Sequence, residues 1–241
     1  MQLTDFSTLT FDCYGTLIDW ETGIFTALHP LLARAGVRMR RNAALEAFAR
    51  LEQRQEAATP AMKYADLLAT VHDQLAGEWG ATPDAAESRM FGGSVGDWPE
   101  FADTVASLQY LQQHYRLVIL SNVDRESFRA TNRRLGVTCT AIYTAEDIGS
   151  YKPDPGPFAY LIEHLGAMGI DKRHILHTAQ SLFHDHAPAN AAGLASAWID
   201  RRHDDEGWGA TSAPPSDVHY DFRFTSLADM VKAHQDAVRA G

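Results

Sequence analysis

An aspartate stands where a short apolar run ends, and this position makes its carboxylate a candidate nucleophile. Residues 9–11 are β-prone, Asp12 follows them, and Gly15 then favours a tight turn. In an open α/β sheet, ligands bind beyond the carboxyl ends of the strands, which is where Asp12 would lie. The backbone N–H groups of residues 13–16 could turn toward the negative charge of a bound substrate. The alternative is that Asp12 caps the next helix.

The same arrangement, an apolar run followed by polar residues, recurs along the chain. Each run is a strand candidate, and polar residues that follow parallel strands meet at one edge of the sheet. Pro153 keeps the residue before it out of a helix interior. The polar residues are Ser121 and Asn122 after 117–120, Lys152 in the loop after 141–144, and Ser181 and Asp185 after 175–178.

Strand-like runs alternate with helical segments over most of the chain, which predicts an α/β fold with a doubly wound parallel sheet. The strand candidates are 7–11, 117–120, 141–144, 175–178, 194–199 and a remnant from Phe222. The helical candidates between them are 104–114, 124–135, 157–165, 187–192 and a closing helix to Val238, whereas 201–217 is polar, rich in Gly and Pro, and predicted as an irregular surface segment.

One stretch departs from this alternation. From 20 to 98 no strand run is convincing, and Ile24, Leu28 and Leu31 keep helical spacing. We interpret 20–98 as a helical cap, inserted into an α/β core made of 1–19 and 99–241. An insert that follows Asp12 directly could act as a lid over it.

Composition narrows the functional classes. The chain has 241 residues, 45% hydrophobic content and a net charge of −10, which argues against nucleic acid or an anionic membrane as partner. It lacks a long apolar segment and an amino-terminal signal pattern, so we expect a soluble, cytoplasmic protein. Its two cysteines, Cys13 and Cys139, lack metal-ligand spacing, and Cys13 is interpreted as a packing residue. Oligomeric state stays open, with a homodimer among the alternatives.

Four motifs in order resemble those of the haloacid dehalogenase superfamily, in the branch with a helical cap that includes the 2-haloacid dehalogenases. The segments 11–24, 184–190 and 196–199 resemble most closely the L-azetidine-2-carboxylate hydrolases of that branch. The motifs are Phe-Asp-Cys-Tyr-Gly-Thr-Leu at 11–17, Leu-Ser-Asn at 120–122, Tyr-Lys-Pro-Asp at 151–154 and Ser-Leu-Phe-His-Asp at 181–185.

The resemblance implies a role for each motif. Asp12 would attack an electrophilic centre and form an ester that water hydrolyses. Thr16, Ser121 and Asn122 would hydrogen-bond Asp12 or the substrate carboxylate. Lys152 would keep Asp12 ionised, and Asp185 would position or deprotonate the water. For each residue the alternative is structural: a loop lysine, strand-end turn residues, or an N-cap aspartate before 187–192.

Two positions favour carbon over phosphorus as the electrophile. Phosphatases of the superfamily carry a second Asp two residues after the nucleophile, where this chain has Tyr14. They also hold Mg²⁺ with an acidic residue in the fourth motif, where this chain has the uncharged Gln180. We therefore expect no metal and no cofactor, with a small carboxylate and water as the reactants. A Mg²⁺-dependent phosphatase and a catalytically silent binding protein are the alternatives.

The resemblance also implies a substrate pocket under the cap. Arg50, with Arg54 as the alternative, would bind the substrate carboxylate, although either could be a solvated surface residue. Tyr14 and Trp20 would line the pocket with Ser181, although both aromatic residues could equally be core packing. The substrate would be a 2-haloacid or L-azetidine-2-carboxylate. Dehalogenases hold the water with an Asn and a Ser, where this chain has Leu182 and Gln180. His184 and His186 flank Asp185 and could assist proton transfer or be structural.

Overall fold

The computed structural model describes residues 1–240, and its centre is one sheet of six parallel strands. The strand order is β3-β2-β1-β4-β5-β6, so the first strand of the chain lies in the middle of the sheet. The predicted doubly wound α/β fold is confirmed, with every predicted strand present. The strands are β1 (Thr8–Phe11), β2 (Arg116–Ser121), β3 (Ala141–Thr144), β4 (Ile175–Ala179), β5 (Ala195–Ile199) and β6 (Phe222–Phe224).

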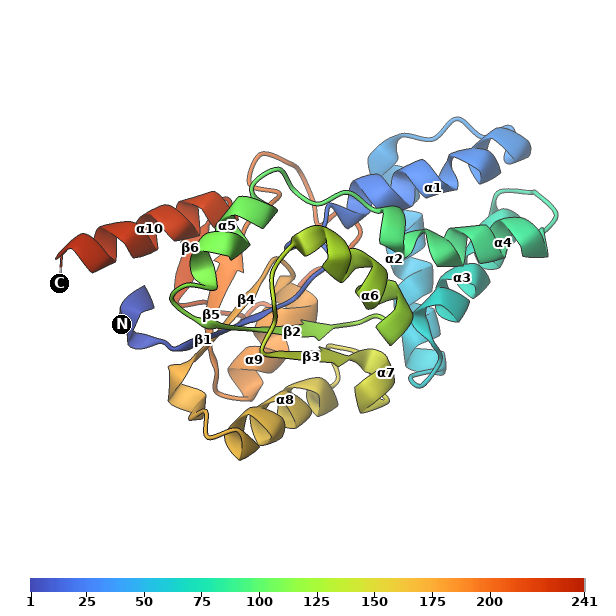
Figure 1. The fold of residues 1–241 in the computed structure, drawn as a ribbon. Coiled ribbons are helices and arrows are strands. Elements are labelled where there is room, and N and C mark those ends of the chain that lie inside the picture. The colour runs from blue at the N-terminus through green and yellow to red at the C-terminus, as the bar shows by residue number, and fades with distance from the viewer. Residues whose placement is uncertain (241) are drawn as a thin grey trace.

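Helices cover both faces of this sheet (Figure 1). Strand β2 shows why, because its alternate residues enter two different apolar clusters: Leu117 and Ile119 enter one, Val118 and Leu120 the other. Helices α5 (Thr104–Leu111), α6 (Arg125–Leu135) and α10 (Leu227–Ala240) pack on the first face, and α8 (Pro155–Ala167) and α9 (Ala187–Ala191) on the second. The short helix α7 (Ala145–Ile148) follows β3.

Local signals explain where several helices begin and end. The Asp124 side chain accepts a hydrogen bond from Ser127 N and caps α6, which ends at the left-handed Gly136, φ 66°. Helix α8 begins two residues earlier than predicted, because Pro155 fits the first helical position after the cap residue Asp154.

Residues 20–98 contain helices and no strand, as predicted. The α-helices are α1 (Trp20–Ala35), α2 (Arg41–Ala58), α3 (Tyr64–Glu78) and α4 (Ala85–Gly92). Figure 1 shows these helices together beyond the edge of the sheet at which β1 and β2 end. The cap residue of α1 is Asp19, whose carboxylate accepts from Thr22 N at 3.1 Å, so Asp12 is not a helix cap. We call residues 20–98 the helical insert.

The segment 201–217 is irregular, as predicted, but it does not lie wholly on the surface. Ala210 and Thr211 are buried, and Ala210 N donates to the carboxylate of Glu21 in α1 at 2.8 Å. The segment therefore packs against the helical insert. Within residues 1–240, no helix has the length and apolar character that a membrane-spanning helix requires.

Alanine substitutions at two glycines test how the helical insert is packed. In α1, a Cβ on Gly23 would overlap the Trp98 ring, whereas a Cβ on Gly77 in α3 would meet no atom. We expect Gly23→Ala to lower the free energy of unfolding by about 1–3 kcal/mol through overpacking. The control Gly77→Ala should be neutral or stabilising by up to about 1 kcal/mol. Urea denaturation measures both, and equal stabilities for the two variants would contradict this packing.

Candidate active site

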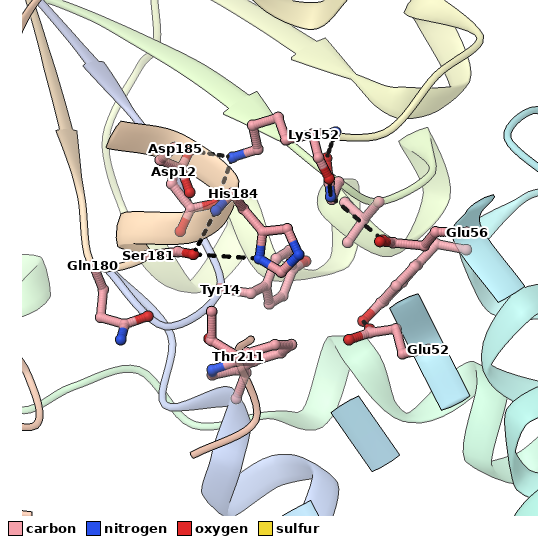
Figure 2. Close-up of a pocket in the computed structure, with 14 residues that line it drawn as sticks. Asp12, Tyr14, Glu52, Glu56, Lys152, Gln180, Ser181, His184, Asp185 and Thr211 are labelled. Carbon is pink, nitrogen blue, oxygen red and sulfur yellow. Dashed lines mark hydrogen bonds and ion pairs between the residues drawn. The ribbon is translucent and has the colours of Figure 1, made fainter. Parts of the chain in front are cut away.

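A buried lysine joins two carboxylates at the carboxyl end of the sheet. Nζ of Lys152 donates to Asp12 Oδ1 at 2.9 Å, to Asp185 Oδ1 at 2.6 Å and to the carbonyl of Leu120 at 3.1 Å. The three residues of this ion triad are 1%, 6% and 1% exposed for Lys152, Asp12 and Asp185 (Figure 2). All three ammonium hydrogens thus have acceptors, so one cation serves both carboxylates.

The contacts within the triad favour the charged form of each member. Burial alone would lower the pKa of Lys152, but the Asp12 and Asp185 carboxylates raise it above its ordinary value. Burial alone would raise the pKa of Asp185, but Lys152 and His177 hold it well below its usual range. Burial raises the pKa of Asp12, and the contact with Lys152 opposes that effect. The ammonium therefore favours the ionised form of Asp12 against the effect of burial.

Different elements bring the triad together. Asp12 follows β1, and its backbone N donates to Thr178 O in β4 at 3.2 Å. Lys152 lies in the loop between α7 and α8, as predicted. Asp185 lies inside a wide helical turn, Leu182–His186, whose cap is Ser181: its Oγ accepts from His184 N at 2.9 Å. Asp185 is therefore not an N-cap.

Thr16 orients the second carboxylate oxygen of Asp12. Its hydroxyl donates to Asp12 Oδ2 at 2.8 Å and accepts from the backbone N of Gln180 at 2.8 Å. The backbone N of Gly15 donates to Ile18 O at 2.8 Å, so this amide cannot serve a substrate. Among the described residues, the backbone amides of Cys13, Tyr14 and Thr16 donate to no acceptor, and of these three residues Tyr14 lines the pocket.

Asn122 hydrogen-bonds the backbone of Lys152 rather than the carboxylate of Asp12. Its Nδ2 donates to the Lys152 carbonyl at 2.9 Å, and its Oδ1 accepts from the Lys152 N at 2.7 Å. It makes no hydrogen bond to Asp12, contrary to one of the two predicted contacts, but it does line the pocket. Ser121 is buried, and its Oγ has no partner among residues 1–240.

His177 belongs to the site, and the sequence analysis missed it. Its Nε2 lies 3.0 Å from Asp185 Oδ1, and its Nδ1 lies 2.9 Å from Thr10 Oγ1. Because an ionised Asp185 only accepts, Nε2 carries the hydrogen of this contact. A histidine inside an otherwise buried strand was the available signal, since buried polar groups need partners.

A pocket opens on the triad and contains most of the predicted substrate-side residues. It leaves about 440 Å³ of space, its open mouth included. The Tyr14 hydroxyl is 2.8 Å from Thr131 Oγ1, and the Trp20 ring meets Phe48 edge to face, so both wall residues are also held by packing. The lining residues outside the triad are Tyr14, Trp20, Glu52, Glu56, Tyr64, Asn122, Val123, Gln180, Ser181, His184 and Thr211.

The two flanking histidines have different surroundings. His184 lines the pocket, and burial lowers its pKa to about 4, so its imidazole is neutral near pH 7. His186 faces away and lies 3.0 Å from both Ser196 Oγ and the Ala179 carbonyl oxygen. Cys13 is buried and does not line the pocket. His184 is therefore the flanking histidine that could contact a substrate.

The structure does not bring the predicted arginines to the pocket. Arg50 points outward from α2 and forms an exposed ion pair with Glu78 of α3, with 2.6 Å between Nη2 and Oε2. Arg54 is also exposed and does not line the pocket. The pocket face of α2 carries Glu52 and Glu56 instead.

This pair of glutamates is the second feature that the sequence analysis missed. Phe48, Glu52 and Glu56 are all buried and recur every four residues, so they share one face of α2. A signal was present in the sequence, because charged residues that continue an apolar helical stripe point toward a buried surface.

The side chains at this site do not provide the oxygen ligands with which superfamily phosphatases bind Mg²⁺. Asp12 and Asp185 already bind the Lys152 ammonium, and the neighbouring Tyr14 and Gln180 carry no charge. Within residues 1–240, no group of three or more His, Cys, Asp or Glu side chains is arranged to hold a metal ion.

The sequence of the chain is similar to that of a known protein family. The model of the haloacid dehalogenase-like hydrolases matches residues 6–193. No curated protein sequence matches significantly. The chain belongs to the haloacid dehalogenase-like hydrolases and is a hydrolase.

Solved structures show the same fold at low sequence identity. A defluorinating L-2-haloacid dehalogenase is 23% identical, with a TM-score of 0.77 and 94% of each chain covered. The L-2-haloacid dehalogenase from Xanthobacter autotrophicus with chloropropionic acid covalently bound is 17% identical, with a TM-score of 0.77 over 95% of this chain and 98% of that one. The magnesium-bound HAD-hydrolase YfnB from Bacillus subtilis is 20% identical, with a TM-score of 0.73 over 94% of this chain and 97% of that one.

The ion triad predicts a pH-dependent effect of removing its cation. We expect Lys152→Met to lose about 3–5 kcal/mol of unfolding free energy at pH 7, because two buried carboxylates lose their partner. Without the ammonium, burial puts their folded pKa values above the unfolded ones, so the loss should shrink as pH falls from 8 to 5. Urea denaturation across this range measures it.

The matched control is Lys232→Met, since Lys232 is exposed and pairs only with Asp236 in the same helix. We expect a change within about 0.5 kcal/mol at every pH for this surface pair. An equal, pH-independent loss in both variants would contradict the role of the triad.

Proposed function

We propose that the chain is a metal-independent hydrolase in which Asp12 attacks an sp³ carbon beside a carboxylate and forms an aspartyl ester. The observation that carries this proposal is the ion triad, which places the Asp12 carboxylate at the pocket. The Lys152 ammonium beside it already has three hydrogen-bond acceptors. A buried, oriented carboxylate facing a small pocket is suited to nucleophilic catalysis. The substrate is a small carboxylic acid with a leaving group at its second carbon.

In the first step, an oxygen of Asp12 displaces the leaving group from carbon. Oδ1 receives Lys152 Nζ and Oδ2 receives the Thr16 hydroxyl, so the carboxylate enters the reaction in a fixed orientation. The substrate carboxylate meets the free backbone amides near Tyr14 rather than an arginine. This arrangement suits a monoanionic group better than a phosphate dianion, which Asp12 would repel without a metal.

In the second step, water attacks the carbonyl carbon of the ester and restores Asp12. If Oδ2 forms the ester, Oδ1 becomes the carbonyl oxygen and stays beside Lys152, which stabilises the oxyanion. The low pKa of Asp185 makes it better suited to position the water than to deprotonate it. The neutral imidazole of His184 lines the same space and can hydrogen-bond the water.

Two leaving groups fit this mechanism. Halide is supported by the likeness to L-2-haloacid dehalogenases, one of them with chloropropionic acid covalently bound. A strained ring nitrogen is supported by the resemblance of segments 11–24 and 196–199 to L-azetidine-2-carboxylate hydrolases. Ring opening also needs a proton on the departing nitrogen, whereas halide release does not. A Mg²⁺-dependent phosphatase is disfavoured by Tyr14 and Gln180.

Replacement of the nucleophile tests the covalent step. We expect Asp12→Asn to lower kcat by about 10⁴-fold or more on L-azetidine-2-carboxylate and 2-chloropropionate, whichever the wild type turns over. In a single turnover in H₂¹⁸O, the label should enter the Asp12 carboxylate of the wild type, because water attacks the ester at its carbonyl carbon. Peptide mass spectrometry after digestion measures the label.

The control is Asp171→Asn, an exposed carboxylate of the loop before β4, which should leave kcat within twofold. Activity should also survive EDTA. Label found only in the product, or hydrolysis of phosphate esters that EDTA abolishes, would overturn the proposal.

A further inference from the structure

The helical insert brings two carboxyl groups into the catalytic pocket. Glu52 and Glu56 lie on successive turns of α2 and are 5% and 8% exposed. Figure 2 shows them across the pocket from Asp12 and Lys152. A substrate that reaches Asp12 therefore enters a space bounded by carboxyl groups on two sides.

Neither glutamate has a cationic partner. Within residues 1–240, no lysine or arginine forms an ion pair with Glu52 or Glu56. Glu52 accepts one hydrogen bond, from the Tyr64 hydroxyl at 2.6 Å, and Glu56 accepts a long one, 3.4 Å, from Asn122 Nδ2. The described residues donate nothing to the second oxygen of either carboxyl. Each therefore keeps a free acceptor inside the pocket.

Burying a carboxylate costs free energy unless a cation or hydrogen-bond donors replace its lost contacts with water. Burial raises the pKa of Glu52 to about 8 and, with repulsion from Glu52, raises that of Glu56 well above its usual value. The free pocket thus retains a proton on the pair near pH 7. A cation placed against the carboxyls would compensate for their lost hydration and favour ionisation of one carboxyl, while the other keeps the proton that the pair holds.

The charge of the whole pocket also favours a cation. Its lining contains four carboxyl groups and, among the described residues, one lysine and no arginine. Lys152 is already shared between Asp12 and Asp185. A 2-haloacid brings only negative charge to this space, whereas an amino acid brings a cation that the α2 side can bind and a carboxylate that the backbone amides can bind.

We propose that Glu52 and Glu56 bind the positively charged nitrogen of the substrate, and that this nitrogen is the leaving atom. The inference rests on the proposed attack by Asp12. The substrate class is then a small cyclic amino acid whose strained ring nitrogen is attached to the carbon under attack. The glutamates determine specificity for nitrogen over halide.

The atoms of this step balance. The ring nitrogen enters as an ammonium with two hydrogens. Asp12 forms the C–O bond, the C–N bond breaks, and its electron pair stays on nitrogen as a neutral primary amine. The proton retained by the glutamate pair passes to this amine, which becomes an ammonium and stays attached to the substrate through the remaining ring carbons. Water then hydrolyses the ester, so the product carries a hydroxyl group where the nitrogen was attached, and the proton released as Asp12 ionises again returns to the glutamate pair.

A binding experiment isolates the nitrogen site from the chemistry. In the Asp12→Asn protein, L-azetidine-2-carboxylate and cyclobutanecarboxylate differ in having NH₂⁺ or CH₂ at one ring position. Calorimetry should show that the first binds at least about tenfold more tightly, as expected for one charged contact. The preference should disappear when Glu52→Gln and Glu56→Gln are added, since glutamine keeps the shape and removes the charge. Equal binding of the two ligands before that addition would overturn the proposal.

Kinetics give a second, independent measure. On L-azetidine-2-carboxylate, Glu56→Gln and Glu52→Gln should each lower kcat/KM by about 100-fold, the scale expected when a buried charge on the substrate has no counter-charge in the protein. The matched control is Glu46→Gln, on the exposed face of the same helix, which should stay within twofold. Circular dichroism and thermal unfolding confirm that each variant is folded; removal of a buried carboxyl should not destabilise it. Equal activity in all three variants would overturn the proposal.

The two proposals fail in different ways. If the ring nitrogen confers no preference in binding, the glutamate pair is not a nitrogen site, whether or not Asp12 forms an ester. If the preference is present and ¹⁸O does not enter Asp12, the attack by Asp12 is wrong and the nitrogen site stands.

Discussion

The active site is arranged around one buried ammonium. Lys152 forms an ion pair with both Asp12 and Asp185, and without it two buried carboxylates would lie close together with no cation between them. The surrounding contacts keep these charged groups in place. Asn122 holds the lysine backbone, His177 holds Asp185, and the hydrogen bonds that lower the cost of burial also orient the Asp12 carboxylate. Stability and the geometry of the site therefore depend on the same few atoms.

The sheet can supply this triad because parallel strands end together at one edge. Each strand delivers polar residues to that edge, but a sheet edge alone is open to water. The helical insert and the segment around Thr211 close it, and a closed site strengthens every charge interaction inside. The insert also contributes chemistry of its own, since α2 presents Glu52 and Glu56 where an arginine was predicted. The core therefore supplies the ion triad, and the insert supplies the two glutamates that line the pocket opposite it.

The family supplies the fold, and we expect the remaining pocket residues to decide which substrate is accepted. Tyr14 and Gln180 carry no charge at the positions where superfamily phosphatases carry carboxylates. Leu182 stands where a dehalogenase uses an amide to hold water, and His184 and the low-pKa Asp185 occupy the neighbouring space. The proposed substrate, a zwitterion with a ring nitrogen, would complement a pocket that has four carboxyls and one cation already paired with two of them.

Local sequence patterns were enough to predict the alternation of strands and helices, the all-helical stretch 20–98 and the motif residues Asp12, Lys152 and Asp185. Apolar periodicity, the positions of proline and glycine, and short motifs at strand ends carry this information. Which side chains meet depends instead on tertiary packing. Arg50 lies at the surface and Glu52 in the pocket because the rotation of α2 is set by packing of Phe48 and its neighbours against the other helices. The contact between His177 and Asp185 likewise joins residues whose side chains face each other only after β4 and the following turn have formed. Local patterns indicate that such residues are buried, whereas tertiary packing decides which partners they meet.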